Sequence, residues 1–169
     1  VSVDVEVQVG AVATVVAQML NRPDDPMVRI GNTGTFQFRL LDARGNTLPE
    51  GAVSLTLPEV LAGSIVLARA ACGAEPGTSL NGLTCVANGN GLVELEVRAG
   101  GALPGVPVTL VARGHNAGGD DPETRMEIDL RSGQAAQLST SPAGRMAAVV
   151  GADAGVVSVR ISDAGGNPV

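Results

Sequence analysis

The side chains in this sequence that could perform catalysis are not spaced as a catalytic set. The single histidine, His115, lies in a stretch rich in glycine and asparagine, and the sequence shows no partner for it. A nucleophile elbow, a phosphate-binding glycine loop and a zinc-binding helix motif are all absent from the sequence. Because catalysis requires such constellations, the sequence predicts a protein that is not an enzyme.

Acidic side chains cluster a few residues after the histidine, at Asp120, Asp121 and Glu123. Carboxylates on loops are the ligands that calcium prefers, and a calcium site needs about 6 to 8 oxygen atoms. The spacing lacks the regular alternation of dedicated calcium loops. Two interpretations therefore stay open: a solvated acidic loop, or a calcium site at these three residues. Calcium is the one cofactor that the sequence suggests.

Cys72 and Cys85 are the only cysteines. A disulfide that closes so short a loop stabilises a fold by about 3 kcal/mol in the chain-entropy model, and it indicates an oxidising compartment. The alternative is a pair of unlinked buried thiols. A structural zinc site is disfavoured, because zinc needs four ligands and the one histidine is distant in sequence. The spacing favours the disulfide.

A strand followed by a turn is the main recurring feature of the chain. Residues 35–48 alternate apolar and polar side chains and then reach a polar, glycine-containing segment, which predicts a strand that ends in a tight turn. Residues 156–169 repeat the pattern without a gap, 121 residues later. The turn residues shared by the two copies are Asp42, Gly45 and Asn46 in the first and Asp163, Gly166 and Asn167 in the second.

The comparison of the two copies indicates turn chemistry and not a catalytic site. Arg44 in the first copy is replaced by Gly165 in the second, whereas the aspartate, glycine and asparagine are retained. Aspartate and asparagine side chains hydrogen-bond the backbone in turns, and glycine permits a positive φ. At the same offset, residues 132–139 are expected to match the first strand of the preceding unit, residues 11–18.

Composition and periodicity predict an all-β chain with an antiparallel β-sandwich. The apolar residues are mostly Val, Leu and Ala, aromatic residues amount to 1%, and 23 Gly and 10 Pro supply turns. Phe36 and Phe38 fall on the apolar side of their strand and are expected in the core. Residues 59–71 fit a strand or a short helix, with the strand favoured. Residues 88–91 predict a hairpin turn. Seven or so strands spaced in this way suit a sandwich.

The second copy of the pattern resembles the bacterial immunoglobulin-like repeats of invasin/intimin-type surface proteins. In that family a strand ends in Asp-x-x-Gly-Asn-Pro-Val, which here is Asp163, Gly166, Asn167, Pro168 and Val169. The first copy departs from the motif, because Thr47-Leu48 stands in place of Pro-Val. The resemblance implies a secreted or surface-exposed immunoglobulin-like sandwich that serves as a stalk, spacer or adhesive module, and it brings no catalytic residues.

The predicted organisation is a tandem repeat with incomplete units at both ends. Residues 11–131 form a complete immunoglobulin-like module, residues 1–10 the closing strand of a preceding unit or a donated strand, and residues 132–169 the opening strands of a following module. An arbitrary fragment of a longer array is the alternative. The apolar residues expected to pair with strands of other units are Val1, Val3, Val5, Val7, Val9, Val157, Val159 and Ile161.

These features favour a structural module of an extracellular surface protein or filament, in which units complement each other's strands. The alternative is an adhesin-type module whose loops recognise a host or cell-surface protein. The expected partners are other copies of the chain or neighbouring repeats. A net charge of −6 without a basic cluster argues against nucleic acid. No apolar run reaches the roughly 18 to 20 residues of a membrane span.

Overall fold

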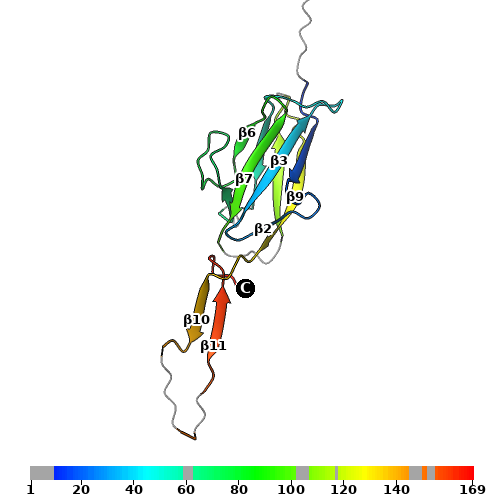
Figure 1. Ribbon diagram of the computed structural model, residues 1–169. Coiled ribbons are helices and arrows are strands. Elements are labelled where there is room, and N and C mark those ends of the chain that lie inside the picture. The colour runs from blue at the N-terminus through cyan, green and yellow to red at the C-terminus, as the bar shows by residue number, and fades with distance from the viewer. Residues whose placement is uncertain (1–9, 59–62, 102–106, 117, 145–149, 152–154) are drawn as a thin grey trace, which may run out of the picture.

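The computed structural model describes residues 10–58, 63–101, 107–116, 118–144, 150–151 and 155–169. Within these ranges the chain forms eleven strands and no helix. Nine strands build two sheets that pack face to face, and β10 and β11 form a separate hairpin that extends from one end of the sandwich (Figure 1). The all-β fold class predicted from composition is confirmed.

The two sheets have four and five strands. The first has the order β1-β3-β7-β5 and the second the order β2-β9-β8-β4-β6. The members of the first are β1 (Thr14–Met19), β3 (Thr33–Leu41), β7 (Leu92–Ala99) and β5 (Ile65–Leu67). The members of the second are β2 (Met27–Arg29), β9 (Glu123–Arg131), β8 (Val108–Gly114), β4 (Ala52–Thr56) and β6 (Thr84–Val86).

This strand order is that of an immunoglobulin-like sandwich. In chain order, β1, β3, β4, β5, β7, β8 and β9 take the places of strands A to G, which pair as ABED in one sheet and CFG in the other. The first strand is divided between the sheets: β1 pairs antiparallel with β3, whereas β2 pairs parallel with β9. Pro23 and Pro26 lie between β1 and β2 and end the first ladder, because proline cannot donate a ladder hydrogen bond.

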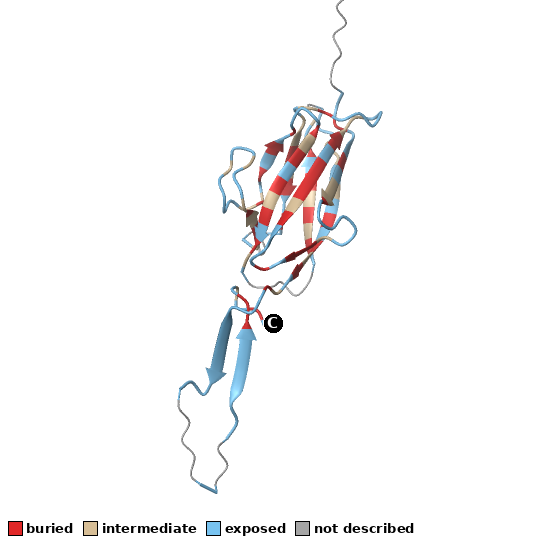
Figure 2. Ribbon diagram, in the orientation of Figure 1, coloured by how far each residue is buried: buried red, intermediate tan, exposed pale blue. Residues whose placement is uncertain are grey.

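The core lies between the inner faces of the two sheets (Figure 2). On β3 the alternation places Phe36, Phe38 and Leu40 on the inner face, where all three are fully buried, as the sequence predicts. Leu110 of β8 and Ile128 of β9 are buried on the opposing sheet. Burial of each side chain of this size stabilises the fold by about 1.5–3 kcal/mol.

The structure tests two predictions of local structure, at residues 59–71 and at residues 88–91. Part of the ambiguous segment 59–71 is a strand, β5, and residues 59–62 lie outside the described residues. The hairpin predicted at residues 88–91 is wrong: a tight turn is present, but β6 before it pairs with β4 and β7 after it pairs with β3 and β5. The turn therefore carries the chain from one sheet to the other, a difference that local turn chemistry does not encode.

The hairpin of β10 (Gln137–Ser141) and β11 (Ser158–Ser162) reproduces the pairing of β1 with β3. The Ala136 N–H donates to the Ser162 carbonyl, and the Ala13 N–H donates to the Leu41 carbonyl, both at 2.8 Å. The offset of 121 residues holds from Leu41 to Ser162 but becomes 123 from Ala13 to Ala136. The expected match of residues 132–139 to residues 11–18 is therefore wrong by two residues, because the connection between the paired strands differs in length.

Candidate functional site

Two turns with the same hydrogen bonds follow β3 and β11. In the first, Asp42 Oδ1 accepts hydrogen bonds from the N–H groups of Arg44 and Asn46, both at 2.8 Å. The Asn46 side-chain amide donates to Asp42 Oδ2 at 2.9 Å. Gly45 closes the turn with a φ of 83°. The carboxylate thus holds the turn from within, as Asp-Asn turn chemistry predicts.

The second turn repeats these bonds. Asp163 Oδ1 accepts from the N–H groups of Gly165 and Asn167, both at 2.9 Å, and the Asn167 side-chain amide lies 3.1 Å from the same oxygen. Gly166 has a φ of 83°. The same residue types at the same spacing build the same local structure twice. We name these segments, residues 42–46 and 163–167, the first and second Asp-Asn turns.

The surroundings of the two turns differ. Asn46 is exposed, whereas Asp163 is fully buried and Asn167 is 6% exposed. The second turn lies against the end of the sandwich: the Gly133 N–H donates to Asp163 Oδ2 at 2.9 Å, and the Asn167 side-chain amide donates to the Gly101 carbonyl at 3.0 Å. The second Asp-Asn turn therefore joins the hairpin to the sandwich. We call this set of contacts the joint.

Both aspartates have a lowered pKa. Burial acts most strongly on the pKa of Asp163 and raises it, but hydrogen bonds from Gly133, Asn167 and Gly165 together lower it further than burial raises it. The side-chain hydrogen bond from Asn46 is the largest influence on the pKa of Asp42 and lowers it. Each carboxylate is therefore an ionised acceptor at neutral pH.

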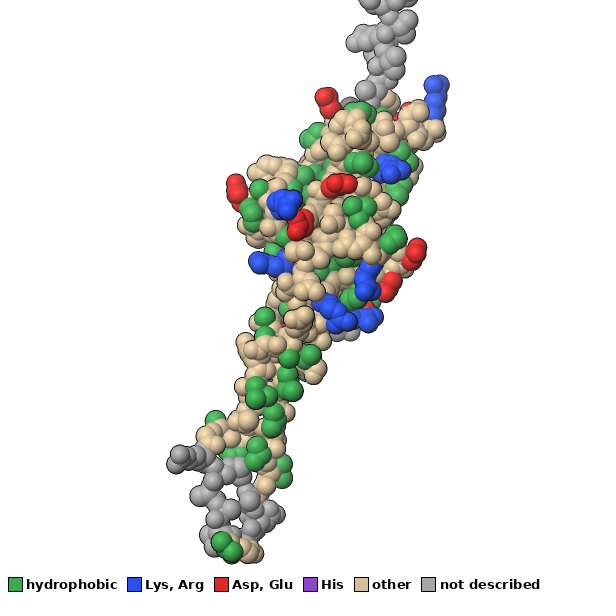
Figure 3. Space-filling view, viewed as in Figure 1, with side chains coloured by type: hydrophobic (Ala, Val, Ile, Leu, Met, Phe, Trp, Pro, Cys, Tyr) green, Lys and Arg blue, Asp and Glu red, His purple; other side chains and the backbone are tan. Residues whose placement is uncertain are grey.

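The hairpin presents one apolar face to solvent (Figure 3). Leu138 is 68% exposed, Val159 60% and Ile161 47%, and Leu138 pairs with Ile161 across the ladder. Side chains alternate between faces along a strand, so Ser139 and its partner Arg160 lie on the other face. The hairpin therefore has the one-sided pattern of a strand pair in a sandwich, without a second sheet against it in the part of the chain described.

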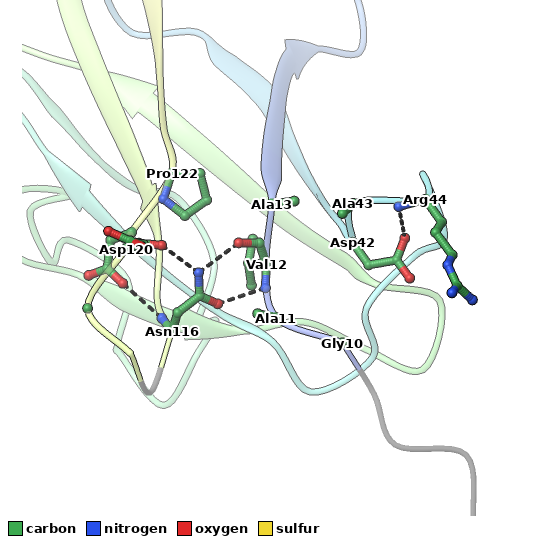
Figure 4. A pocket seen from close by; sticks show the side chains of 12 residues that line it. Gly10, Ala11, Val12, Ala13, Asp42, Ala43, Arg44, Asn116, Asp120 and Pro122 are labelled. Atoms are coloured by element: carbon green, nitrogen blue, oxygen red, sulfur yellow. Dashed lines mark hydrogen bonds between the residues drawn. The ribbon is translucent and has the colours of Figure 1, made fainter.

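Asn116 fastens the β8–β9 loop to the segment before β1 (Figure 4). Its side-chain oxygen accepts from the Val12 N–H and its side-chain amide donates to the Val12 carbonyl, both at 2.7 Å. Its own N–H donates to Asp121 Oδ1 at 2.8 Å. A groove runs beside this contact, and its lining includes Arg44 and Asp120. The first Asp-Asn turn and the acidic loop thus share one end of the sandwich.

The carboxylates of Asp121 and Glu123 are engaged by protein groups. Asp121 Oδ2 lies 3.4 Å from His115 Nδ1. Glu123 contacts Arg113 at 3.1 Å and Arg125 at 2.9 Å, and the hydrogen bond from Arg113, followed by that from Arg125, lowers its pKa. Across the described ranges, no three acidic, histidine or cysteine side chains gather as metal ligands. Calcium binding by Asp120, Asp121 and Glu123 stays a prediction, which calorimetric titration with calcium tests.

Cys72 and Cys85 form a disulfide with a Cα–Cα distance of 4.9 Å. Cys85 belongs to β6, the edge strand beside β4, and Cys72 belongs to the connection that follows β5. The bond therefore ties an edge strand to a long connection, and it indicates an oxidising environment. No helix in the described part of the chain is long and apolar enough to cross a bilayer.

Only some of the residues predicted to pair with strands of other units lie in the described part of the chain. Val159 and Ile161 lie on β11, and Val157 directly precedes it. Val1, Val3, Val5, Val7 and Val9 lie outside the described residues. Sequence reasoning missed Asn116, Gly101 and Gly133, whose partners are distant in the chain. The change from Arg44 to Gly165 between the copies was the available signal, because close approach of two backbone segments is one of the roles for which glycine is used.

No protein-family model matches the sequence, and no curated protein matches it. Among solved structures, domains 4 and 5 of the S-layer protein SbsC align with a TM-score of 0.45 and 14% identity, over 72% of this chain and 46% of that one. The Yersinia pseudotuberculosis adhesin InvE aligns with a TM-score of 0.42 and 13% identity, over 70% and 32%. A cohesin module from a Clostridium perfringens family 33 glycoside hydrolase aligns with a TM-score of 0.43 and 14% identity, over 73% and 99%. The fold assignment rests on the strand order of this chain.

Proposed function

We propose that this chain is a non-catalytic structural module of an extracellular surface protein or filament, in which immunoglobulin-like units follow one another and complete each other with β-strands. The exposed apolar face of the β10–β11 hairpin carries the proposal. A tandem array of such units accounts for that face, because the opening strands of a unit remain uncovered until the other strands of that unit cover them.

The sandwich itself indicates what fits the hairpin face. Val159 and Ile161 correspond, at the offset of 121 residues, to Phe38 and Leu40, which are fully buried. In the sandwich the inner face of β3 is covered by the sheet that contains β8 and β9. The matching occupant of the hairpin face is therefore a sheet of the same kind. We propose that a second copy of the chain contributes strands to it, since exposed apolar strands favour such addition.

Sedimentation velocity of the full chain at increasing concentration tests this assembly. We expect self-association that weakens when Val159 and Ile161 are both changed to lysine, because each lysine places a charge on the face to be buried. The matched control changes Ser139 and Ser158 to lysine, which adds the same charges to the opposite face. We expect the control to associate like the unmodified chain. A monomer at every concentration would reject strand addition between copies.

The groove beside the first Asp-Asn turn favours a second candidate, an adhesin-type module that binds a host or cell-surface protein through its loops. The groove is lined by backbone at Gly10 and by polar side chains that include Asp42 and Asn116. In that case Arg44→Glu would reduce binding of the labelled chain to cells, whereas the double lysine change on the hairpin would not. The opposite result would support assembly.

A further inference from the structure

Resting on the proposed function, in which β10 and β11 open a following unit, we propose that the third residue of each Asp-Asn turn decides which immunoglobulin-like unit can lie against it. Glycine at position 165 leaves room for the backbone at Gly101, which lies at one end of this sandwich. Arginine at position 44 leaves no room for it. The sandwich therefore does not stack on a second copy of itself through these turns.

The joint is a contact between backbones. A Cβ atom added at Gly165 would collide with the Gly101 carbonyl oxygen, and it would lie 2.9 Å from the Asn167 side-chain nitrogen. That oxygen also accepts the hydrogen bond from Asn167. A backbone carbonyl cannot move aside as a flexible side chain can. Any side chain at position 165 therefore forces the two units apart.

A second glycine contributes to the same contact. A Cβ atom added at Gly133 would collide with the Ile30 carbonyl oxygen. The Ile30 N–H donates to the Arg131 carbonyl at 2.9 Å, and the Arg29 guanidinium donates to the Ser132 carbonyl at 3.3 Å. The segment that leaves β9 is thus held against the end of β2. The close approach at both glycines holds the second turn in one position on the sandwich.

The first turn has only one of these two glycines. Gly10 occupies the place of Gly133, because each precedes by three residues the alanine that opens its strand pair. A Cβ atom at Gly10 would lie 3.3 Å from Asp42 Cβ, and one at Gly133 would lie 3.6 Å from Asp163 Cβ. The glycine next to the aspartate is therefore retained. The glycine that admits the neighbouring loop is replaced by Arg44.

Gly165→Arg is a sharp test, because it gives the second turn the residue of the first. The first turn forms with arginine at this position, and Gly165 does not have a positive φ, so the backbone of the turn tolerates the change. Within the turn only the Asn167 side-chain amide, 2.9 Å from the added Cβ atom, has to shift. The Gly133 N–H reports the joint, since it donates to Asp163 Oδ2. The Asn167 N–H reports the turn, since it donates to Asp163 Oδ1 within the turn.

We expect Gly165→Arg in the full chain to accelerate hydrogen exchange of the Gly133 N–H by about tenfold or more, measured by NMR, because the joint opens. Exchange of the Asn167 N–H is expected to stay within about threefold of the unmodified chain. Gly165→Ala should resemble Gly165→Arg, because the collision begins at Cβ. The matched control Arg44→Gly changes the first turn and should leave Gly133 unaffected.

Protection of Gly133 equal to that of the unmodified chain in both Gly165 variants would overturn the proposal, because a side chain would then be compatible with the joint. This result is independent of the sedimentation experiment. Hairpin-dependent association with an unchanged joint would retain the proposed function and reject the role of position 165. An altered joint without association would support the role of position 165 and reject the proposed function.

Discussion

A buried carboxylate that accepts hydrogen bonds from two parts of the chain is the central chemical feature of this protein. Asp42 and Asp163 each hold their own turn, and Asp163 also accepts the Gly133 N–H. The local bonds follow from residue type and spacing, so both turns form. The additional bond requires another segment in place, so only the second turn carries it among the residues described.

Lowering the pH is expected to loosen the joint. The folded-state pKa of Asp163 lies below the value of about 3.9 of an unperturbed aspartate. Its hydrogen bonds therefore contribute their full stability above that value, and the contribution is lost as the pH falls through the folded-state pKa. An NMR titration that follows the Asp163 carboxyl carbon and the Gly133 N–H together measures the loss.

The two signals should share one midpoint, below about 3.9. Asp163→Asn removes the charge at similar size, and we expect Gly133 to exchange rapidly at every pH in this variant. Asp42→Asn serves as the matched control, because it changes the first turn and should leave the Gly133 titration as it was. A Gly133 midpoint well above that of the Asp163 carboxyl would assign the transition to another group.

Strands β3 and β11 show how one sequence pattern takes on two roles. Both alternate apolar and polar residues and both end in an Asp-Asn turn. The inner residues of β3 lie in a closed core, whereas those of β11 face solvent. The strand pattern therefore indicates which face is apolar enough to be buried. Whether that face is buried depends on the presence of a second sheet.

Shortening the side chain at corresponding positions of β3 and β11 should have unequal effects on stability. Phe38→Ala is expected to lower the free energy of unfolding by about 3–5 kcal/mol, since it leaves a cavity in the core. Val159→Ala, at the corresponding position of β11, should change it by no more than about 0.5 kcal/mol at low protein concentration, because the side chain is exposed. Urea unfolding followed by far-ultraviolet circular dichroism measures both. Equal losses would mean that the hairpin face is covered in solution.

The described part of the molecule consists of a closed sandwich and a hairpin joined to one of its ends (Figure 1). All of the residues in the hydrophobic core cluster, from Val12 to Leu130, belong to the sandwich. Among the described residues, the hairpin contributes none of its apolar side chains to that core. The sandwich should therefore be stable by its own contacts, and the hairpin should add to assembly.

Removal of residues 132–169 is expected to shift the melting temperature of the sandwich by less than about 4 °C, because little more than a few hydrogen bonds at the joint hold the hairpin to the sandwich. Differential scanning calorimetry of residues 1–131 beside the full chain measures the shift. The mobility of the Gly101 amide should rise in the shortened chain. A much larger fall in melting temperature would place the hairpin within the folding unit of the sandwich.

Short-range patterns in the sequence were sufficient to predict the strands and the side chains with which they line the core. Alternation predicted that Phe36 and Phe38 are buried, and the aspartate, glycine and asparagine spacing predicted both turns, because these features depend on residues within a few positions of each other. The disulfide between Cys72 and Cys85 was also within reach of sequence reasoning, since it closes a local loop.

Contacts between distant segments depended on the folded chain. Gly101 and Asn167 are 66 residues apart, and Val12 and Asn116 are 104 apart. The turn at residues 88–91 was predicted as a hairpin but crosses between sheets, because pairing partners are chosen by the closure of the sandwich. Closure likewise brings Gly101, Gly133 and Asp163 together at one end of the sandwich. Residue types made the second Asp-Asn turn possible, and only the arrangement of the sheets made it a joint.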